Sequence, residues 1–366
     1  MNLEALLERA LIIQAIPAPT FSEGARAAWL HKEFNRLAIG TAEQDPIGNV
    51  YFRIPGGNQN PVIVSAHLDS VFPIDAPLDS HRTADRLVGP GVGDNAIGIA
   101  ILVELAIEIS GNSPPGDIWL VANIGEEGLG NLVGMKNVVA RFGKKVSAYI
   151  IIEGMAFGHI YHRGLPIRRF QLDAEGIGGH SWIHKGRPSA VHALIEVGAL
   201  ILNIPLGDAP KSSLNIGILH GGTTINTIAS RAHFEIDLRS EDADHLAKLS
   251  KEIENTVLMY KNAEIKLHLK TIGERPIGGL PQDHALVLAA QSSLRAVGVK
   301  RCYLEAGSTD ASIPLSMGFP AVCVGITKGG GAHSLEEYIE IDPIERGFNS
   351  LQSLIYAAFD IANEST

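Results

Sequence analysis

This sequence of 366 residues has few cysteines, no excess of positive charge and no long hydrophobic run. Its two cysteines are Cys302 and Cys323, and Cys323 stands in the apolar run PAVCVGI, so we expect a buried thiol and no disulfide. The net charge of -10, without a Lys/Arg cluster, argues against a nucleic-acid partner. No apolar stretch approaches the roughly 20 residues of a membrane-spanning helix, so we expect no membrane partner.

The chain also lacks the signs of a targeting segment or of a repeat. The N-terminal MNLEALLERALIIQAI is amphipathic and contains acidic residues, without a basic leader or cleavage site. We expect a surface helix there and a cytoplasmic protein. Internal repeats and low-complexity linkers are absent as well. A chain of this length exceeds the size at which a single core keeps growing, which favours two domains.

Strands and helices alternate through the N-terminal half. Residues 1–16 have helical periodicity, and Thr20 and Glu23 of TFSE form a capping-box signature for a second helix ending near Leu37. NVYFRI, PVIVSAH, DIWLVANI and SAYIIIE are typical of strands, with helices expected after Asp94 and near NLVGMKNVVARF. The alternation predicts an α/β fold with a mixed, largely parallel sheet flanked by helices.

A different pattern begins after about Arg163. RRFQLDAEG, SLNIGILHGG, AHFEIDLRS and AEIKLHLK alternate apolar with polar residues, as half-exposed antiparallel strands do. Two helices are expected among them, near 189–202 and 242–260. From Gly279 the earlier pattern returns, ending in a helix after Asp342. We therefore predict one domain from 1–163 and 279–366, with an α+β domain, 164–278, inserted into it.

Five side chains that commonly bind divalent metals recur along the predicted outer domain, each just past a strand-like apolar run. They are His67 in VIVSAHLD, Asp94 in GPGVGDN, Glu127 in LVANIGEEG, Glu153 in AYIIIEG and His333 in GGGAHSLEEY. Ligands bind beyond the carboxyl ends of the strands in such sheets, so we expect these residues to converge there. Two imidazoles and three carboxylates suffice for two adjacent cations when one carboxylate bridges.

Two further acidic residues suggest catalytic roles. Glu126 precedes Glu127 and is a candidate general base for activating a water. Asp69 lies two residues after His67, where its carboxylate can accept the second ring proton and fix the tautomer. Each motif also has an ordinary alternative: Asp69 caps a turn, Asp94 is only a helix N-cap, and the GEEG segment is a solvated acidic turn.

The order AHLD, GVGDN, GEEG, IIEG and GAHSLEEY resembles metallopeptidase family 20 over nearly the whole chain. That family contains peptidase T, aminoacylase, acetylornithine and succinyl-diaminopimelate deacylases, and glutamate-releasing carboxypeptidases. The resemblance implies a zinc-exopeptidase-like fold, an inserted lid and dimerisation domain, and a homodimer. It also implies two divalent metal ions; zinc is the first expectation, with cobalt or manganese open because mixed nitrogen and oxygen ligands suit several metals.

The resemblance gives the five metal-binding candidates separate roles. His67 and Glu153 would bind one metal ion, and Glu127 and His333 would bind the other. Asp94 would bridge the two ions. This arrangement uses every candidate ligand once, apart from the bridging carboxylate.

The remaining roles implied by the resemblance concern catalysis and substrate. Glu126 would be the base and proton shuttle, and Asp69 would orient His67. His180, in GIGGHSWIHKGRPSA, matches a lid histidine that reaches the active site of the other subunit and stabilises the oxyanion. The matched substrate-contacting or pocket-lining positions are Asn226 and Arg239 in GGTTINTIASRAHFEIDLR, and Gly307, Ser308 and Asp310 in EAGSTDASIP.

One ligand position narrows the expected substrate. Glu153 stands where the aminopeptidase branch typically carries Asp, and it resembles the carboxypeptidase and N-deacylase branches. We therefore expect hydrolysis of an amide bond in small peptides or N-acyl amino acids. Three alternatives stay open: a non-catalytic metal-binding regulatory or scaffold protein on the same fold, an enzyme with a single metal, and a peptidase T-like aminopeptidase.

Overall fold

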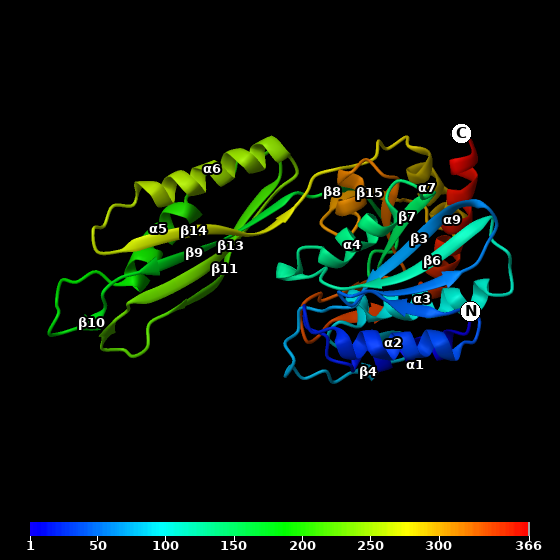
Figure 1. Ribbon diagram of the computed structural model, residues 1–366, viewed down its shortest axis with the longest axis horizontal. Coiled ribbons are helices and arrows are strands. Elements are labelled where there is room, and N and C mark those ends of the chain that lie inside the picture. Colours follow the sequence, from blue (N-terminus) through cyan, green and yellow to red (C-terminus); the bar gives the residue numbers. More distant parts are fainter. Residues whose placement is uncertain (365–366) are drawn as a thin grey trace. The chain divides into compact units, whose positions relative to one another are not determined.

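The computed structural model describes residues 1–364 and divides the chain into two compact units (Figure 1). Unit 1 combines Met1–Gly164 with Gly278–Thr366, and unit 2 is Leu165–Ile277. Each unit has its own cluster of buried apolar side chains, as separately packed domains do. Within residues 1–364, no helix combines the length and the apolar character that crossing a membrane requires.

Within the described residues, unit 1 is built on an eight-stranded sheet with the order β1-β2-β6-β3-β7-β16-β8-β15. Its strands are β1 (Ala42–Gln44), β2 (Val50–Ile54), β3 (Gln59–His67), β6 (Gly116–Asn123), β7 (Ala148–Glu153), β8 (His159–Gly164), β15 (Tyr303–Gly307) and β16 (Ala321–Gly325). The central strands β6, β3, β7 and β16 are mutually parallel, whereas β1, β2 and β8 introduce antiparallel pairs. The predicted mixed, largely parallel sheet is confirmed.

The parallel register brings the ends of β3 and β7 to the same level. Ser65 of β3 pairs with Ile151 of β7, and the two strands end two residues later at His67 and Glu153. Both strands approach this edge through buried, mainly apolar residues, which is typical of the centre of a parallel sheet. Two of the predicted metal ligands therefore leave the sheet side by side.

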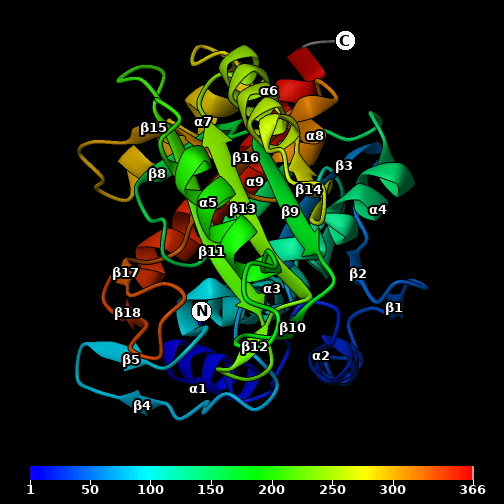
Figure 2. The ribbon, with the colours of Figure 1, turned by 90° about the vertical axis from the view of Figure 1, so that its left-hand side faces the viewer.

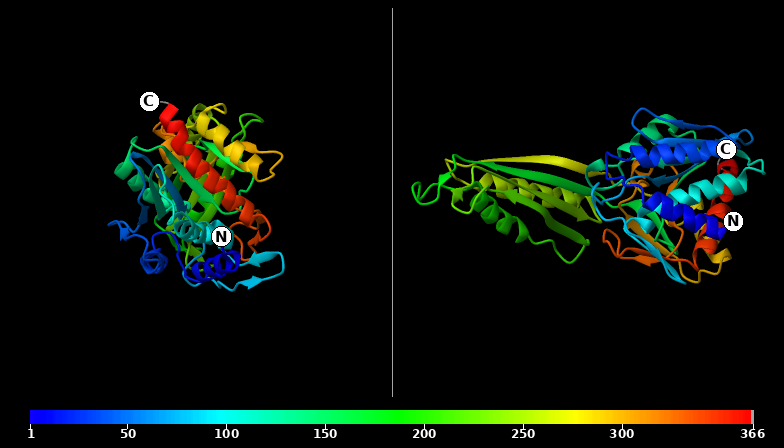
Figure 3. Two further views of the ribbon diagram at one scale, coloured as in Figure 1. Left: turned by 90° about the vertical axis from the view of Figure 1, so that its right-hand side faces the viewer. Right: turned by 90° about the horizontal axis from the view of Figure 1, so that it is seen from below.

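Helices of unit 1 flank this sheet, as the sequence predicts. They are α1 (Leu3–Gln14), α2 (Gly24–Arg36), α3 (Ile97–Ile109), α4 (Val133–Phe142), α7 (Ala285–Ala296), α8 (Ser312–Ser316) and α9 (Ile344–Glu364), with a short turn η2 (Gly128–Gly130). α3 packs on β3 and β6, and the long α9, prominent in the left view of Figure 3, packs on β3 and β7. α3 is apolar on nearly every side because it is buried on nearly every side.

The capping box predicted for α2 is wrong. α2 begins after Glu23 without a side-chain cap. The Thr20 hydroxyl instead donates to Oδ2 of Asp69 at 2.9 Å, and Oε1 of Glu23 accepts from the backbone N–H groups of Phe21 and Gly125. The two side chains therefore bind other segments of unit 1, a use that local sequence pattern does not reveal.

A small sheet joins two distant segments of unit 1. It consists of β17 (Gly329–Gly330), β18 (Tyr338–Glu340), β5 (Arg86–Val88) and β4 (His81–Arg82), in that order. β18 pairs antiparallel with β5, which places the segment around His333 beside the segment that leads to Asp94. Asp94 lies in a short irregular turn, η1 (Val92–Ala96), and has non-helical backbone angles. The regular helix begins at Ile97, so Asp94 does not itself open it.

Unit 2 is a four-stranded antiparallel sheet with the order β11-β13-β9-β14 and two helices (Figure 2). Its elements are β9 (Ile167–Glu175), β10 (Gly179–His180), α5 (Ala190–Leu202), β11 (Ser212–Gly221), β12 (Thr227–Ile228), β13 (Arg231–Ser240), α6 (Ala243–Met259) and β14 (Lys266–Arg275). Alternate residues of β9 and β13 are buried, and they pack with the apolar faces of α5 and α6. β10 and β12 form a separate short pair.

Candidate metal-dependent active site

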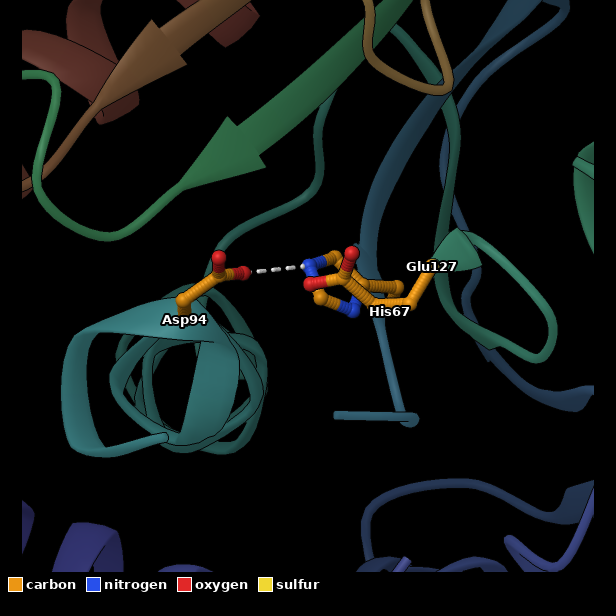
Figure 4. A group of neighbouring side chains, drawn as sticks. All are labelled: His67, Asp94 and Glu127. Atoms are coloured by element: carbon orange, nitrogen blue, oxygen red, sulfur yellow. Dashed lines mark hydrogen bonds and ion pairs between the residues drawn. The ribbon is translucent and has the colours of Figure 1, made fainter. Parts of the chain in front are cut away.

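Three of the predicted ligands converge at the carboxyl edge of the large sheet (Figure 4). His67 ends β3, Asp94 lies in η1, and Glu127 follows β6. One ligand atom of each lies within 4.8 Å of the others, a spacing that can hold a metal ion. Nε2 of His67 is 3.0 Å from Oδ1 of Asp94, the contact drawn in Figure 4.

The other two predicted ligands surround the same aspartate. Nε2 of His333, between β17 and β18, lies 3.2 Å from Oδ2 of Asp94 and 3.6 Å from Oε1 of Glu127. Oε2 of Glu153 lies 4.0 Å from Nε2 of His67. The two oxygens of Asp94 thus face different imidazoles, Oδ1 toward His67 and Oδ2 toward His333. Each imidazole also has a second carboxylate nearby.

These separations fit the chemistry of a divalent cation. Two nitrogen or oxygen ligands about 2.1 Å from a tetrahedral ion lie roughly 3.4 Å apart. The nitrogen–oxygen separations of the cluster run from 3.0 to 4.0 Å. A mixed set of imidazole and carboxylate donors suits zinc and several other divalent metals. The cluster is therefore a candidate metal site by both spacing and donor type.

The charges of the cluster also favour a bound cation. Burial raises the pKa of Glu127 to about 7, despite its contact with His333, and burial raises the pKa of Glu153 well above its ordinary value. Contacts with Asp94 and Glu127 raise the pKa of His333 to about 10. The raised pKa values of the glutamates show that these carboxylates lie close together and are shielded from water. Their ionised forms are costly in free energy unless a positive charge lies nearby. A divalent cation would supply that charge.

The ring of His67 is fixed through its other nitrogen. Nδ1 lies 3.0 Å from the backbone carbonyl oxygen of Asp69 and 3.5 Å from Oδ1 of its carboxylate. A proton on Nδ1 donated to that carbonyl leaves the lone pair of Nε2 for a metal ion, the tautomer that a ligand requires. The sequence predicts the carboxylate of Asp69 as the acceptor of this ring proton, whereas the main-chain oxygen of Asp69 is the nearer acceptor in the structure.

The carboxylate of Asp69 makes shorter contacts with a different part of the site. Its Oδ1 accepts the backbone N–H of Glu126 at 3.0 Å, and its Oδ2 accepts that of Glu127 at 2.9 Å. Oε1 of Glu23 accepts the preceding N–H, of Gly125, at 3.1 Å. Three consecutive amides of the GEE turn are thus held by buried carboxylates. This fixes the backbone from which the side chains of Glu126 and Glu127 project.

Glu126 is itself part of the buried cluster. Its side chain is 5% exposed. Its charge contributes to the raised pKa values of Glu127, Glu153 and Asp310, so it lies within electrostatic range of all three. A carboxylate in this position has the chemical capacity to accept a proton from a water at the cluster.

The predicted loop after β15 lies in unit 1. Gly307 is the last residue of β15, and both Gly307 and Ser308 are partly buried. Asp310 is 1% exposed, and its Oδ2 accepts from Nδ2 of Asn123, the last residue of β6, at 2.7 Å. Burial, reinforced by the charge of Glu126, raises the pKa of Asp310 to about 7. This loop therefore borders the GEE turn.

The other predicted residues belong to unit 2. His180 is exposed in β10, and its Nδ1 accepts the backbone N–H of Trp182 at 3.2 Å, which leaves the ring proton on Nε2. The main-chain oxygen of Asn226 accepts the N–H of Ser181 at 3.0 Å. Arg239 is already paired, because its Nε lies 2.6 Å from Oδ2 of Asp237.

Sequence reasoning missed three residues that support the cluster. The sequence predicts a helix cap for Glu23 and no specific role for Asn95 or Glu337. Nδ2 of Asn95 donates to the main-chain oxygen of Ile152 at 2.7 Å, and Oε1 of Glu337 accepts from the N–H of Asp94 at 2.9 Å. A usable signal existed for Glu337, an acid four residues after His333 and directly before the short strand β18. Such a residue needs a buried partner.

The chain is similar to known proteins over most of its length. The sequence pattern of peptidase family M20/M25/M40 matches residues 63–357. A probable carboxypeptidase of Aspergillus flavus is 27% identical over 273 residues, which cover 64% of this chain, and the chain spans only about 60% of that relative's length. A succinyl-diaminopimelate desuccinylase of Corynebacterium glutamicum is 23% identical over 340 residues, covering 90% of each chain.

Solved structures bear out the fold. The structure of a tripeptidase from Staphylococcus aureus superposes with a TM-score of 0.77 at 21% identity, covering 98% of this chain and 99% of that one. The sheet, its helices and the inserted unit are therefore an arrangement already known in solved proteins. Because the family pattern covers residues 63–357, well over half of the chain, the chain belongs to peptidase family M20/M25/M40, a family of metal-dependent peptidases and amidohydrolases.

Proposed function

We propose that this protein hydrolyses an amide bond in small peptides or N-acyl amino acids, using two divalent metal ions and Glu126 as the general base. The observation that carries the proposal is the division of the Asp94 carboxylate between two imidazoles, with Oδ1 near His67 and Oδ2 near His333. A single ion needs only one of those oxygens. A carboxylate with one oxygen toward each of two donor sets is suited to bridge two ions.

Unit 1 would hold both ions. His67, Glu153 and Oδ1 of Asp94 would bind one, and His333, Glu127 and Oδ2 of Asp94 would bind the other. When bound, such ions lower the pKa of a water to roughly 7 and polarise the substrate carbonyl. Zinc is the first candidate for both positions, although the donor set also suits cobalt and manganese.

Side chains of the protein would then transfer the protons of the reaction. Glu126 accepts a proton from the attacking water and delivers it to the nitrogen of the leaving amine, so that the amide C–N bond breaks as a neutral amine departs. Asp69 supports this step, since its carboxylate holds the main-chain N–H groups of Glu126 and Glu127. Because the turn is fixed, the side chain of Glu126 would stay available as the base while that of Glu127 binds metal.

The test of the function is a substrate panel run with metal-free and metal-reconstituted protein. The panel contains dipeptides, and N-acetyl and N-succinyl amino acids, each with and without a free α-carboxylate. We expect hydrolysis that depends on added zinc and favours substrates with a carboxylate beyond the scissile bond. Preference for a free N-terminal amine would favour an aminopeptidase. Metal binding without hydrolysis of any substrate would favour a regulatory or scaffold protein.

As the resemblance implies, His180 of unit 2 would be an oxyanion donor in the active site of the other subunit, and unit 2 would also supply substrate contacts. His180 has its ring proton on Nε2, because Nδ1 accepts from the main chain, and is therefore suited to donate to a developing oxyanion. Asn226 and Arg239 of unit 2, with Gly307 and Ser308 of unit 1, would contact substrate. The pairing of Arg239 with Asp237 means that Arg239 would have to share its charge with that neighbour.

Replacing His180 by alanine is expected to lower kcat by about 10²–10³-fold, the usual effect of losing one oxyanion donor. Metal content should not change, since His180 is not among the proposed ligands. The matched control is His268→Ala, which removes an exposed histidine of β14 from the same unit. Equal kcat values for wild type and His180→Ala would remove His180 from the mechanism.

Unit 2 would also form a homodimer through β11. This strand lies at one edge of the sheet and pairs only with β13 among the described strands, so its outer side presents unpaired main-chain groups. Exposed apolar side chains surround it, including Ile218 and Leu219 of β11 and Leu200 of α5. An edge strand with apolar neighbours is a common site for pairing with a second chain.

Leu219→Asp is expected to weaken the dimer at least about tenfold, because it places a charge in the proposed apolar interface. Sedimentation velocity over a concentration series measures the change. Leu258→Asp is the matched control, since Leu258 is another exposed leucine of unit 2, on α6. Identical monomer–dimer equilibria for the two variants would exclude β11 as the interface.

A further inference from the structure

Glu337 is a buried carboxylate in direct contact with the loop that carries Asp94. Its side chain is 0% exposed. Its Oε1 accepts two backbone N–H groups, that of Gly93 at 2.7 Å and that of Asp94 at 2.9 Å. The contact joins residues more than 240 positions apart in the chain. It is therefore a tertiary contact made specifically to the turn that carries the ligand.

The turn needs such a contact because its own backbone is irregular. Asp94 has φ -120° and ψ 82°, and Asn95 has φ -136° and ψ 39°, so neither residue is held by regular helical geometry. Backbone N–H groups that are buried without a partner are costly. Glu337 satisfies two of them at once, at the residue whose side chain faces both imidazoles.

Two further contacts limit how far the turn can move. Nδ2 of Asn95 donates to the main-chain oxygen of Ile152, the residue before Glu153. A Cβ added at Gly154 would lie 2.1 Å from the oxygen of Gly93, so the two backbones approach as closely as glycine allows. The turn is thus fixed against the end of β7 on one side and against Glu337 on the other.

The small sheet brings Glu337 to this position. Tyr338, the next residue, pairs with Val88 in β5, and the main-chain oxygen of Glu337 accepts from the N–H of Gly89 at 2.8 Å. His333 lies in the same segment, four residues earlier. One short segment therefore contributes a candidate ligand and a contact to the turn of another ligand.

We infer that Glu337 is a positioning residue, which holds Asp94 with its two oxygens toward the two imidazoles and so strengthens the binding of both metal ions. The inference rests on the proposed two-metal function. Removing Glu337 leaves all five candidate ligands in the chain, but releases the amides of Gly93 and Asp94 that set the direction of the bridging carboxylate. Loss of an outer contact of this kind typically costs about 10–100-fold in metal affinity.

The test is isothermal titration of zinc into metal-free, full-length protein. Glu337→Leu keeps the volume of the side chain and removes the acceptor, and we expect weaker zinc binding by about 10–100-fold. Glu337→Gln keeps an oxygen that can accept both N–H groups, and we expect it to bind zinc more tightly than the leucine variant. Recovery of zinc affinity in Glu337→Gln would show that the hydrogen-bond acceptor of residue 337, and not only its volume, determines the affinity.

A buried glutamate elsewhere in unit 1 serves as the control. Glu104 of α3 is 2% exposed and pairs with Arg9 at 3.2 Å, away from the candidate ligands. Glu104→Leu should lower the melting temperature without changing zinc affinity. If Glu337→Leu does not fold, Glu337→Asp, which keeps the charge but shortens the reach, has the same expected loss of zinc affinity.

The outcomes distinguish the inference from the function on which it rests. Wild-type protein that binds no zinc would overturn the proposed function. Tight binding by wild type, with equal binding by a folded Glu337→Leu or Glu337→Asp variant, would overturn the positioning role alone. Loss of affinity in the leucine variant with recovery in Glu337→Gln would support both.

Discussion

Glu126→Gln is expected to lower kcat by about 10²–10⁴-fold, the usual contribution of a general base, while the protein keeps its bound metal. Glutamine has nearly the same shape as glutamate but cannot accept the proton from the attacking water. The backbone of this residue is held independently of its side chain, through the N–H that donates to Asp69. The GEE turn should therefore remain in place, and the loss should be chemical.

Substitutions of two other glutamates serve as comparisons for Glu126→Gln. Glu127→Gln, one residue further along, should lose metal as well as activity, because Glu127 lies in the ligand cluster. Glu336→Gln, at an exposed position of the loop after His333, should change neither. Steady-state kinetics and elemental analysis of the three variants separate the base from the ligand. Wild-type turnover by metal-loaded Glu126→Gln would exclude Glu126 as the base.

Asp94→Ala is expected to have the largest effect on metal binding. Its two oxygens face both His67 and His333, so the substitution removes one ligand from each donor set. The loss of affinity should exceed the roughly 10–100-fold typical of an outer contact, and hydrolysis should fall with it. Elemental analysis after gel filtration in metal-free buffer measures the ions retained per chain.

An exposed aspartate near the same segment provides the control. Asp85→Ala lies just before β5 and removes a carboxylate from solvent, so metal content should stay as in wild type. Loss of only one ion from Asp94→Ala, with the other bound at wild-type affinity, would mean that Asp94 does not bridge. That result would instead indicate that Asp94 serves a single ion.

The sequence predicts where the ligands lie better than it predicts the strand pairing and hydrogen bonds that hold them. His67 and Glu153 follow apolar strand runs, and in a parallel sheet such strands must end at one edge, so their proximity follows from local pattern and topology. For His333 the local pattern predicts a ligand but not which residues lie beside it. Its proximity to Asp94 depends on the pairing of β18 with β5, and no local pattern encodes which distant strand a three-residue strand will join.

The contacts of the side chains that support the cluster are likewise not predictable from local sequence pattern. Thr20 and Glu23 have the spacing of a capping box, yet the structure uses them to bind Asp69 and Gly125. A short polar side chain near a helix start has several possible partners, and a tertiary partner prevailed here over the local cap. Contacts such as that of Glu337 to Gly93 link residues over 240 positions apart, so only the folded chain reveals them.

The most direct test of the account is a zinc titration of the metal-free protein, followed at each step by elemental analysis and by hydrolysis of an N-acyl amino acid from the substrate panel. The account predicts two zinc ions per chain at saturation, full activity only when both are bound, and loss of both from Asp94→Ala. Saturation at one ion per chain with full activity would contradict the shared carboxylate on which the proposed mechanism depends.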